Sequence, residues 1–104
     1  MHPALQPILP ALAPLCIRHG VRSLWLFGSA ASGRAFDPAQ SDLDFIVEFR
    51  DADLGPWMRR FFEFQDALQG LFGRPVDLVL AGSIQNRYFA EAVQATRVPL
   101  YAAA

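Results

Sequence analysis

The chain has 104 residues, of which 53% are hydrophobic and 18% are charged, and its formal net charge at pH 7 is −1. A chain of this length can build one hydrophobic core, so we expect a single domain over residues 1–104. The balanced charge gives no basic surface of the kind that binds nucleic acids generally, so direct nucleic-acid binding is not expected. No apolar run reaches the roughly 18 residues that a transmembrane helix needs. No basic residue precedes Arg18, so no signal peptide is indicated, and we expect a cytoplasmic protein without a membrane segment.

The single cysteine, Cys16, cannot form an internal disulfide and fits a reducing compartment. It lies between Leu15 and Ile17, which favours a buried, inert thiol over a reactive one. The high hydrophobic fraction leaves two possibilities open: a tightly filled core, or an apolar surface that a partner or a second copy covers.

The first part of the chain predicts a helix, a strand and a turn. Residues 1–19 are apolar but contain four prolines, which predicts a short or broken helix ending near His19, with Gly20 as its C-cap. Residues 21–27 are rich in Val, Leu, Trp and Phe and predict a strand. The next elements are a short helix or turn from Gly28 to about Ala35 and a loop over residues 36–40.

Residues 43–49 predict a second strand, whose side chains alternate between two faces. One face would carry Asp42, Asp44, Ile46 and Glu48, and the other Leu43, Phe45, Val47 and Phe49.

The second half predicts a helix that begins at Pro56 and is ended by Gly73 and Pro75. Met58 and Phe62 fall off its apolar stripe and are candidates for contact with a partner. The predicted stripe consists of Trp57, Phe61, Phe64, Leu68 and Leu71. The remaining elements are a strand over 76–80, a helix over 84–96 and a short strand over 98–101. This alternation of strands and helices indicates an α/β or α+β fold.

Asp42 and Asp44 are the first candidate site residues. Residues two apart on a strand share a face and are separated by about 7 Å, so their carboxylates can converge on a cation. Mg²⁺ prefers oxygen ligands and is often held by one or two carboxylates together with substrate phosphates. The alternative is that both aspartates are solvated residues at the start of a strand.

Asp77 interrupts the apolar run Val76–Leu80, where a charge is costly unless it is paired or bound to a metal. If this strand lies beside the second strand, Asp77 becomes a third carboxylate on the same face. Three carboxylates can hold two ions that stabilise an in-line displacement. The alternative is an isolated aspartate on an edge strand, paired with Arg74.

Gly28 and Ser29 follow an apolar strand, and such a turn exposes backbone N–H groups to a phosphate. The spacing from Gly28 to Gly33 matches a P-loop, but Arg34 and Ala35 stand where that motif needs Lys and Ser or Thr. Arg34 could balance phosphate charge or be a solvated loop residue. Further along, surface positions are favoured over nucleotide contacts for Arg87, Tyr88 and Arg97.

Together these residues resemble the nucleotidyltransferase superfamily that includes DNA polymerase beta. Its pattern is an apolar residue followed by Gly-Ser, then two aspartates separated by an apolar residue, then a third carboxylate on a later strand. The matching residues are Phe27-Gly28-Ser29, Asp42-Leu43-Asp44-Phe45 and Asp77. Segments 20–24 and 87–97 look most like the minimal MNT-type nucleotidyltransferases, and the resemblance covers nearly the whole chain from about residue 15.

The resemblance implies a small mixed sheet flanked by helices, a two-ion Mg²⁺ site and a nucleoside triphosphate substrate such as ATP. It also implies an antitoxin that transfers AMP to a tyrosine hydroxyl of a HEPN-type toxin. Asp42, Asp44 and Asp77 would then be catalytic and metal-binding, whereas Gly28, Ser29 and Arg34 would bind the nucleotide. A partner protein or a second copy, in a homo-oligomer, would supply the acceptor.

One departure concerns the segment after Gly-Ser, where the family usually has arginine and this chain has Ser32. Arg34 could replace that arginine in part. Two other functions stay open: an inactive module that neutralises its partner by occlusion, and a transferase acting on a small molecule such as an aminoglycoside. Intact carboxylates argue against the first, and the lack of an added substrate-binding region argues against the second.

Overall fold

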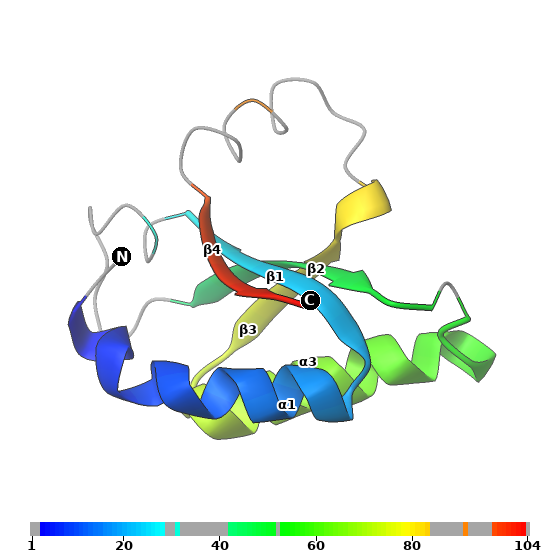
Figure 1. Cartoon of the computed structure of the whole chain (residues 1–104), viewed down its shortest axis with the longest axis horizontal. Coiled ribbons are helices and arrows are strands. Elements are labelled where there is room, and N and C mark those ends of the chain that lie inside the picture. The colour runs from blue at the N-terminus through cyan, green and yellow to red at the C-terminus, as the bar shows by residue number, and fades with distance from the viewer. Residues whose placement is uncertain are drawn as a thin grey trace.

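A four-stranded mixed sheet with two helices on one face forms the structure, which is a computed structural model that describes residues 3–28, 31, 42–51, 53–83, 91 and 97–103 (Figure 1). In chain order its elements are η1 (Pro3–Ala11), α1 (Leu12–Arg18), β1 (Val21–Phe27), β2 (Leu43–Phe49), η2 (Pro56–Met58), α3 (Arg59–Phe72), β3 (Val76–Leu80), η3 (Ala81–Ser83) and β4 (Val98–Ala102). This arrangement confirms the expected α/β class and the bounds predicted for the first three strands.

The sheet order is β3-β2-β1-β4. β1 pairs antiparallel with both β2 and β4, whereas β2 and β3 are parallel. A parallel pair needs a crossover connection, and α3 provides it by running back across the sheet between the two strands. α3 packs on the same face of the sheet as α1 (Figure 1).

The proline-rich N-terminus behaves as predicted. Pro7 and Pro10 lie inside the 3-10 helix η1, and regular α-helix starts only at Leu12. Proline lacks the backbone N–H that donates within a helix, so Pro7 and Pro10 interrupt regular α-helical hydrogen bonding in this segment. α1 ends at Arg18, and Gly20 takes the left-handed conformation with φ 69°, which reverses the chain into β1.

The prediction that Trp57 belongs to the buried stripe of the second helix is wrong. α3 begins at Arg59, and the two residues before it, Trp57 and Met58, both have φ of 57°. This left-handed pair breaks the helical path, so the spacing from Trp57 to Phe61 no longer places them on one face. Trp57 is consequently 93% exposed.

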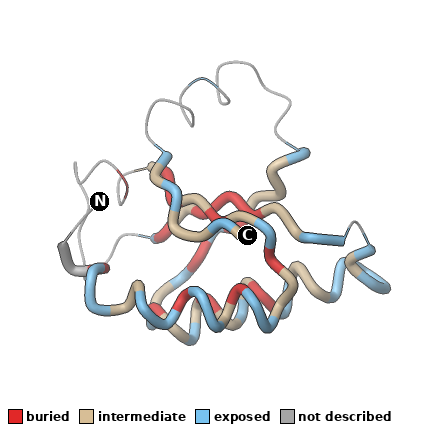
Figure 2. Tube along the Cα trace, viewed as in Figure 1, coloured by how far each residue is buried: buried red, intermediate tan, exposed pale blue. Residues whose placement is uncertain are grey.

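The rest of the predicted α3 stripe is confirmed. Phe64 and Leu68 are fully buried, and Phe72 is an additional buried residue. Phe61 and Leu71 are half-buried and pack against the core. Figure 2 shows the buried positions along the strands and on the sides of the helices that face them.

β1, β2 and β3 divide their side chains between two hydrophobic clusters. Leu24, Leu26 and Phe45 belong to the main core between the sheet and the helices. Phe27 and Ile46 form a smaller cluster on the other face, with Trp25, Val79 and Ala81 against it. The predicted alternation along β2 is therefore correct: Ile46 lies on the face away from the main core.

Cys16 is buried in the main core, as predicted, and burial raises the pKa of its thiol to about 12. Met58 and Phe62 are exposed, as their positions off the stripe predicted. Within the described residues, no helix combines the length and the apolar character that crossing a membrane requires. The predicted turn from Gly28 to about Ala35, the loop over 36–40 and the helix over 84–96 lie outside the described residues, apart from Gly28, Ala31 and Glu91.

Phe64 and Phe62 provide a matched test of the core. Phe64 is 0% exposed and its ring lies 5.5 Å from that of His19, whereas Phe62 is 52% exposed. We expect Phe64→Ala to lower the free energy of unfolding by about 3–5 kcal/mol, because it leaves a cavity. Phe62→Ala should lower it by about 1 kcal/mol or less. Urea unfolding followed by circular dichroism measures both values; equal losses would contradict the packing described.

Candidate active site

The sheet register brings two of the three predicted carboxylates together. Asp44 on β2 lies directly opposite Asp77 on β3, and Phe27 at the end of β1 lies opposite Asp44. Neighbouring strands are about 4.8 Å apart, and directly paired residues project to the same face. The prediction that the third strand lies beside the second is therefore confirmed, and the two carboxylates share the face away from the helices.

The carboxyl group of Asp44 is held in an unfavourable environment for a negative charge. Its pKa is raised from the ordinary value of 3.8 to about 6, first by burial, then by the negative charge of Asp77 and a hydrogen bond between the two carboxyl groups, and last by the charge of Asp42. The charges of both Asp77 and Asp42 therefore act on Asp44. Repulsion of this kind is relieved when a cation binds among the oxygens.

Gly28 is needed for the position of Asp44. A Cβ atom added at Gly28 would lie 2.6 Å from Oδ2 of Asp44, closer than real Cβ contacts. Gly28 also has φ of 75°, a conformation that other residues rarely adopt. The turn continues with a hydrogen bond of 3.2 Å in which the backbone N–H of Ala31 donates to the carbonyl of Gly28.

The two other residues predicted to bind nucleotide, Ser29 and Arg34, lie outside the described residues. Their roles stay predictions that rest on the sequence.

The donor set suits Mg²⁺ in chemistry, because carboxylate oxygens are the ligands that this ion prefers. Asp44 and Asp77 are in contact with each other, and their mutual repulsion is what a divalent cation would offset. In the part of the chain that the structure describes, no group of three or more His, Cys, Asp or Glu side chains is gathered closely enough to hold a metal ion. The structure thus shows the pair of Asp44 and Asp77, whereas the place of Asp42 in a three-ligand site stays a prediction.

The sequence assigned Arg97 to the surface, and the structure shows that it lies on the carboxylate face. Its Cζ atom is 5.4 Å from the ring centroid of Trp25, a cation–π contact. Trp25 packs against the cluster of Phe27 and Ile46 on that face. The alternation of Trp25 with Phe27 along the first strand is the signal that could have pointed to this neighbourhood.

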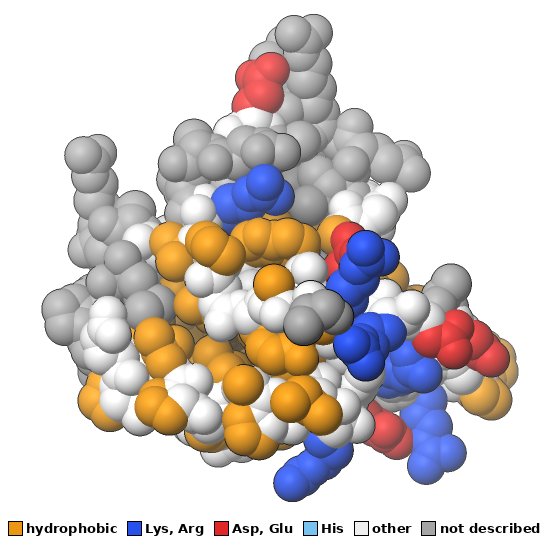
Figure 3. Space-filling model, in the orientation of Figure 1, with side chains coloured by type: hydrophobic (Ala, Val, Ile, Leu, Met, Phe, Trp, Pro, Cys, Tyr) orange, Lys and Arg blue, Asp and Glu red, His pale blue; other side chains and the backbone are white. Residues whose placement is uncertain are grey.

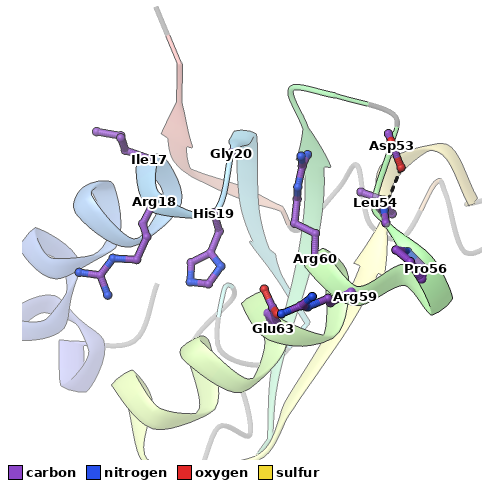
Figure 4. A pocket seen from close by; sticks show the side chains of 11 residues that line it. Ile17, Arg18, His19, Gly20, Asp53, Leu54, Pro56, Arg59, Arg60 and Glu63 are labelled. Atoms are coloured by element: carbon purple, nitrogen blue, oxygen red, sulfur yellow. Dashed lines mark hydrogen bonds and ion pairs between the residues drawn. The ribbon is translucent and has the colours of Figure 1, made fainter.

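A separate cavity of about 560 Å³ lies at the other end of the sheet (Figure 4). It is lined by the C-terminal end of α1, the turn at Gly20 and the first turn of α3, with Arg18, Arg59 and Arg60 among its residues. Arg59 is paired with Glu63 at 2.7 Å, and Arg60 lies over the ring of Phe49. The carboxylate pair is outside this cavity, so it is not where the predicted chemistry would occur.

Comparison with known sequences identifies relatives. Residues 12–103 match the family described as polymerase beta, nucleotidyltransferase. The chain is 36% identical over 77 residues to MJ0128 of Methanocaldococcus jannaschii, provisionally named a protein adenylyltransferase, over 74% of each chain. It is also 36% identical over 69 residues to protein adenylyltransferase MntA of Thermococcus cleftensis, over 66% of this chain and 65% of that one.

Two solved structures are similar as well. One, provisionally described as a minimal nucleotidyltransferase, has a TM-score of 0.72 and 33% identity, covering 96% of this chain and 97% of the other. The second is a tri-AMPylated HEPN toxin of Shewanella oneidensis in complex with its MNT antitoxin, with a TM-score of 0.64 and 19% identity over 94% of this chain and 72% of that one. At that identity, the second likeness shows the fold alone.

The family match begins in α1 and ends just beyond β4, and so includes Gly28 and both members of the carboxylate pair. The sequence relatives and the sheet topology agree with it. On these grounds the chain belongs to the polymerase beta nucleotidyltransferase family.

Proposed function

We propose that this protein is a Mg²⁺-dependent nucleotidyltransferase that moves AMP from ATP to a hydroxyl group, a tyrosine of a partner HEPN-type toxin, and so acts as an antitoxin. The observation that carries the proposal is the pairing of Asp44 with Asp77 beside Gly28. The names of its relatives support protein adenylylation as the reaction.

In this proposal the chain's own residues position the reactants. The turn at Gly28 and Ser29 would hold the triphosphate through backbone N–H groups. The acceptor oxygen forms a bond to the α-phosphorus, and the bond from that phosphorus to the oxygen bridging to the β-phosphate breaks. Pyrophosphate leaves with the bonding electrons, and Asp77 takes the proton of the hydroxyl group.

Asp42, Asp44 and Asp77 would hold the metal. When bound, Mg²⁺ supplies positive charge to the attacking and leaving oxygens of the in-line displacement. Most of the rate enhancement would then come from positioning and charge stabilisation, since phosphoryl-type transfer leaves little covalent chemistry to the protein.

A toxin as acceptor is supported by the complex of an AMPylated HEPN toxin with an MNT antitoxin, whose fold this chain shares. The exposed side chains Met58 and Phe62 are candidates for contact with such a partner. If the chain only occluded its partner, the carboxylates would have no role, and the following tests separate the two cases.

Replacing either paired carboxylate should abolish transfer. We expect Asp44→Asn and Asp77→Asn to lower the transfer of label from α-labelled ATP to the partner HEPN-type toxin by about 1000-fold or more, because each removes an anionic ligand from the reacting centre. Glu48→Gln is the matched control, since Glu48 lies on the same face of β2 and forms an exposed ion pair with Arg22. It should retain wild-type activity.

Circular dichroism and complex formation with the toxin accompany this assay. Folded variants that bind the toxin but transfer no label support the proposal. Wild-type protein that forms the complex and transfers no label would favour occlusion instead, and undiminished transfer by Asp44→Asn would remove the carboxylate pair from the mechanism.

Gly28→Ala should reduce transfer in a different way. The added methyl group would displace the carboxylate of Asp44 and strain a backbone held at φ 75°. We expect a loss of about 10- to 100-fold in kcat/KM, together with a loss of roughly 1 kcal/mol of unfolding free energy. Gly73→Ala, which also alters a positive-φ glycine but meets no atom within 4 Å, is the control and should affect stability only.

The raised pKa of Asp44 makes a prediction about stability. Between about pH 4 and 6 the folded protein binds more protons at this group than the unfolded chain does, so this contribution to stability is present at low pH and is lost as the pH rises through 6. Asp44→Asn should therefore stabilise the metal-free protein at pH 8, by on the order of 1 kcal/mol for a partly solvated group. The gain should vanish at about pH 4. Thermal unfolding in chelator-treated buffer measures it, and a gain that is equal at both pH values would contradict the assigned cause.

A further inference from the structure

Arg97 continues a row of residues that crosses the whole sheet. Leu26 on β1 pairs with Val98 on β4, so extending this register by one residue places Arg97 opposite Phe27. Phe27 in turn pairs with Asp44, which pairs with Asp77. A cation and the carboxylate pair therefore occupy one row, with the backbones of Arg97 and Asp44 about 10 Å apart across two strand spacings.

The cation–π contact fixes which way the Arg97 side chain points. Its guanidinium lies over Trp25, whose ring packs with Phe27 on the carboxylate face. Arg97 is nevertheless exposed, so the ring of Trp25 supports the guanidinium without enclosing it. A planar guanidinium held on an aromatic ring keeps its N–H donors directed outward and loses less side-chain freedom when it binds a phosphate.

The remaining described arginines are distributed differently. Figure 3 shows most of the basic side chains gathered on one side of the molecule. Arg18, Arg59 and Arg60 line the cavity at Gly20, and the backbone N–H of Arg50 donates to the carbonyl of Gly20. Arg22 pairs with Glu48 near the same end. Arg74 precedes β3 and has a buried Nε, whereas Arg97 presents its side chain on the carboxylate face.

A triphosphate at this site needs a cation from the protein. Three carboxylates together with a nucleoside triphosphate carry more negative charge than two divalent ions cancel. Arg97 is an exposed cation on the face of the carboxylates and in the same row of the sheet, so it can supply that charge.

We propose that Arg97, supported by the ring of Trp25, binds the phosphate groups of the nucleoside triphosphate. This assignment rests on the proposed function and adds a substrate-binding residue to it. Arg97 contacts the substrate, whereas Trp25 acts through Arg97 and is a positioning residue.

Calorimetric binding tests the assignment without relying on turnover. Three probes are titrated in Mg²⁺ buffer into wild-type protein and variants: ATP, inorganic triphosphate and AMP. The variants are Arg97→Gln, Arg97→Lys, Trp25→Phe, Trp25→Leu and the matched control Arg22→Gln, which also removes an exposed arginine but at the opposite end of the sheet. Thermal unfolding verifies that each variant is folded.

We expect Arg97→Gln to weaken the binding of ATP and of inorganic triphosphate equally, by about 10- to 100-fold, because one charge-assisted contact is lost. AMP binding should change by about 2-fold or less, Arg97→Lys should fall between wild type and Arg97→Gln, and Arg22→Gln should bind all three probes normally. Trp25→Phe should retain binding, whereas Trp25→Leu should weaken both triphosphates by a few-fold while Arg97 is still present.

Three results would overturn the proposal. If wild-type protein binds ATP and Arg97→Gln binds it equally well, Arg97 has no role in substrate binding and the proposed function is unaffected. If Arg97→Gln weakens the binding of AMP as much as that of ATP, Arg97 does not act on the phosphates that ATP and inorganic triphosphate share and AMP lacks. Wild-type protein that binds neither ATP nor triphosphate would remove the proposed function itself, and this assignment with it.

Discussion

The parallel pairing of β2 with β3 is the constraint on which the rest of the structure depends. It requires a crossover, which α3 supplies, and its register sets Asp44 against Asp77. A shift of β3 by one residue along β2 would turn Asp77 toward the main core and the core residues of β3 outward. Leu43, Phe45 and Leu78 are buried on the helix-covered face. Because side chains alternate along a strand, their burial also fixes the carboxylate pair on the other face.

The carboxylate pair lowers the folding stability of the metal-free protein. Burial and the neighbouring charge raise the pKa of Asp44, and the chain still brings its backbone against the carboxylate at Gly28. A position that costs folding free energy and leaves no room for a side chain is typical of a binding or catalytic site. The main core, with Phe45 and Phe64 fully buried, provides the stability against which this cost is set.

The two faces of the sheet have different tasks. The helix-covered face is packed with apolar side chains, and the other combines the carboxylates with the small cluster of Phe27 and Ile46. Trp25 joins that cluster and lies under Arg97, so one aromatic side chain links apolar packing to the placement of a cation. The arginines near Gly20 line the cavity at the other end of the sheet, away from the carboxylate pair.

Local sequence patterns determined the strands, the interruption of the N-terminal helix by prolines and the carboxylate motif. Alternation, proline and glycine each constrain the backbone over only a few residues, so these features can be recognised without the tertiary structure. The sequence pattern gave a wrong prediction at Trp57. Helical periodicity continues there in the sequence, but Trp57 and Met58 have left-handed backbone angles, so the helix begins only after them. Only the tertiary structure decided that Asp77 pairs with Asp44 and that Arg97 lies over Trp25. Both contacts join residues distant in the chain, and their geometry comes from strand order and register, which no local pattern specifies.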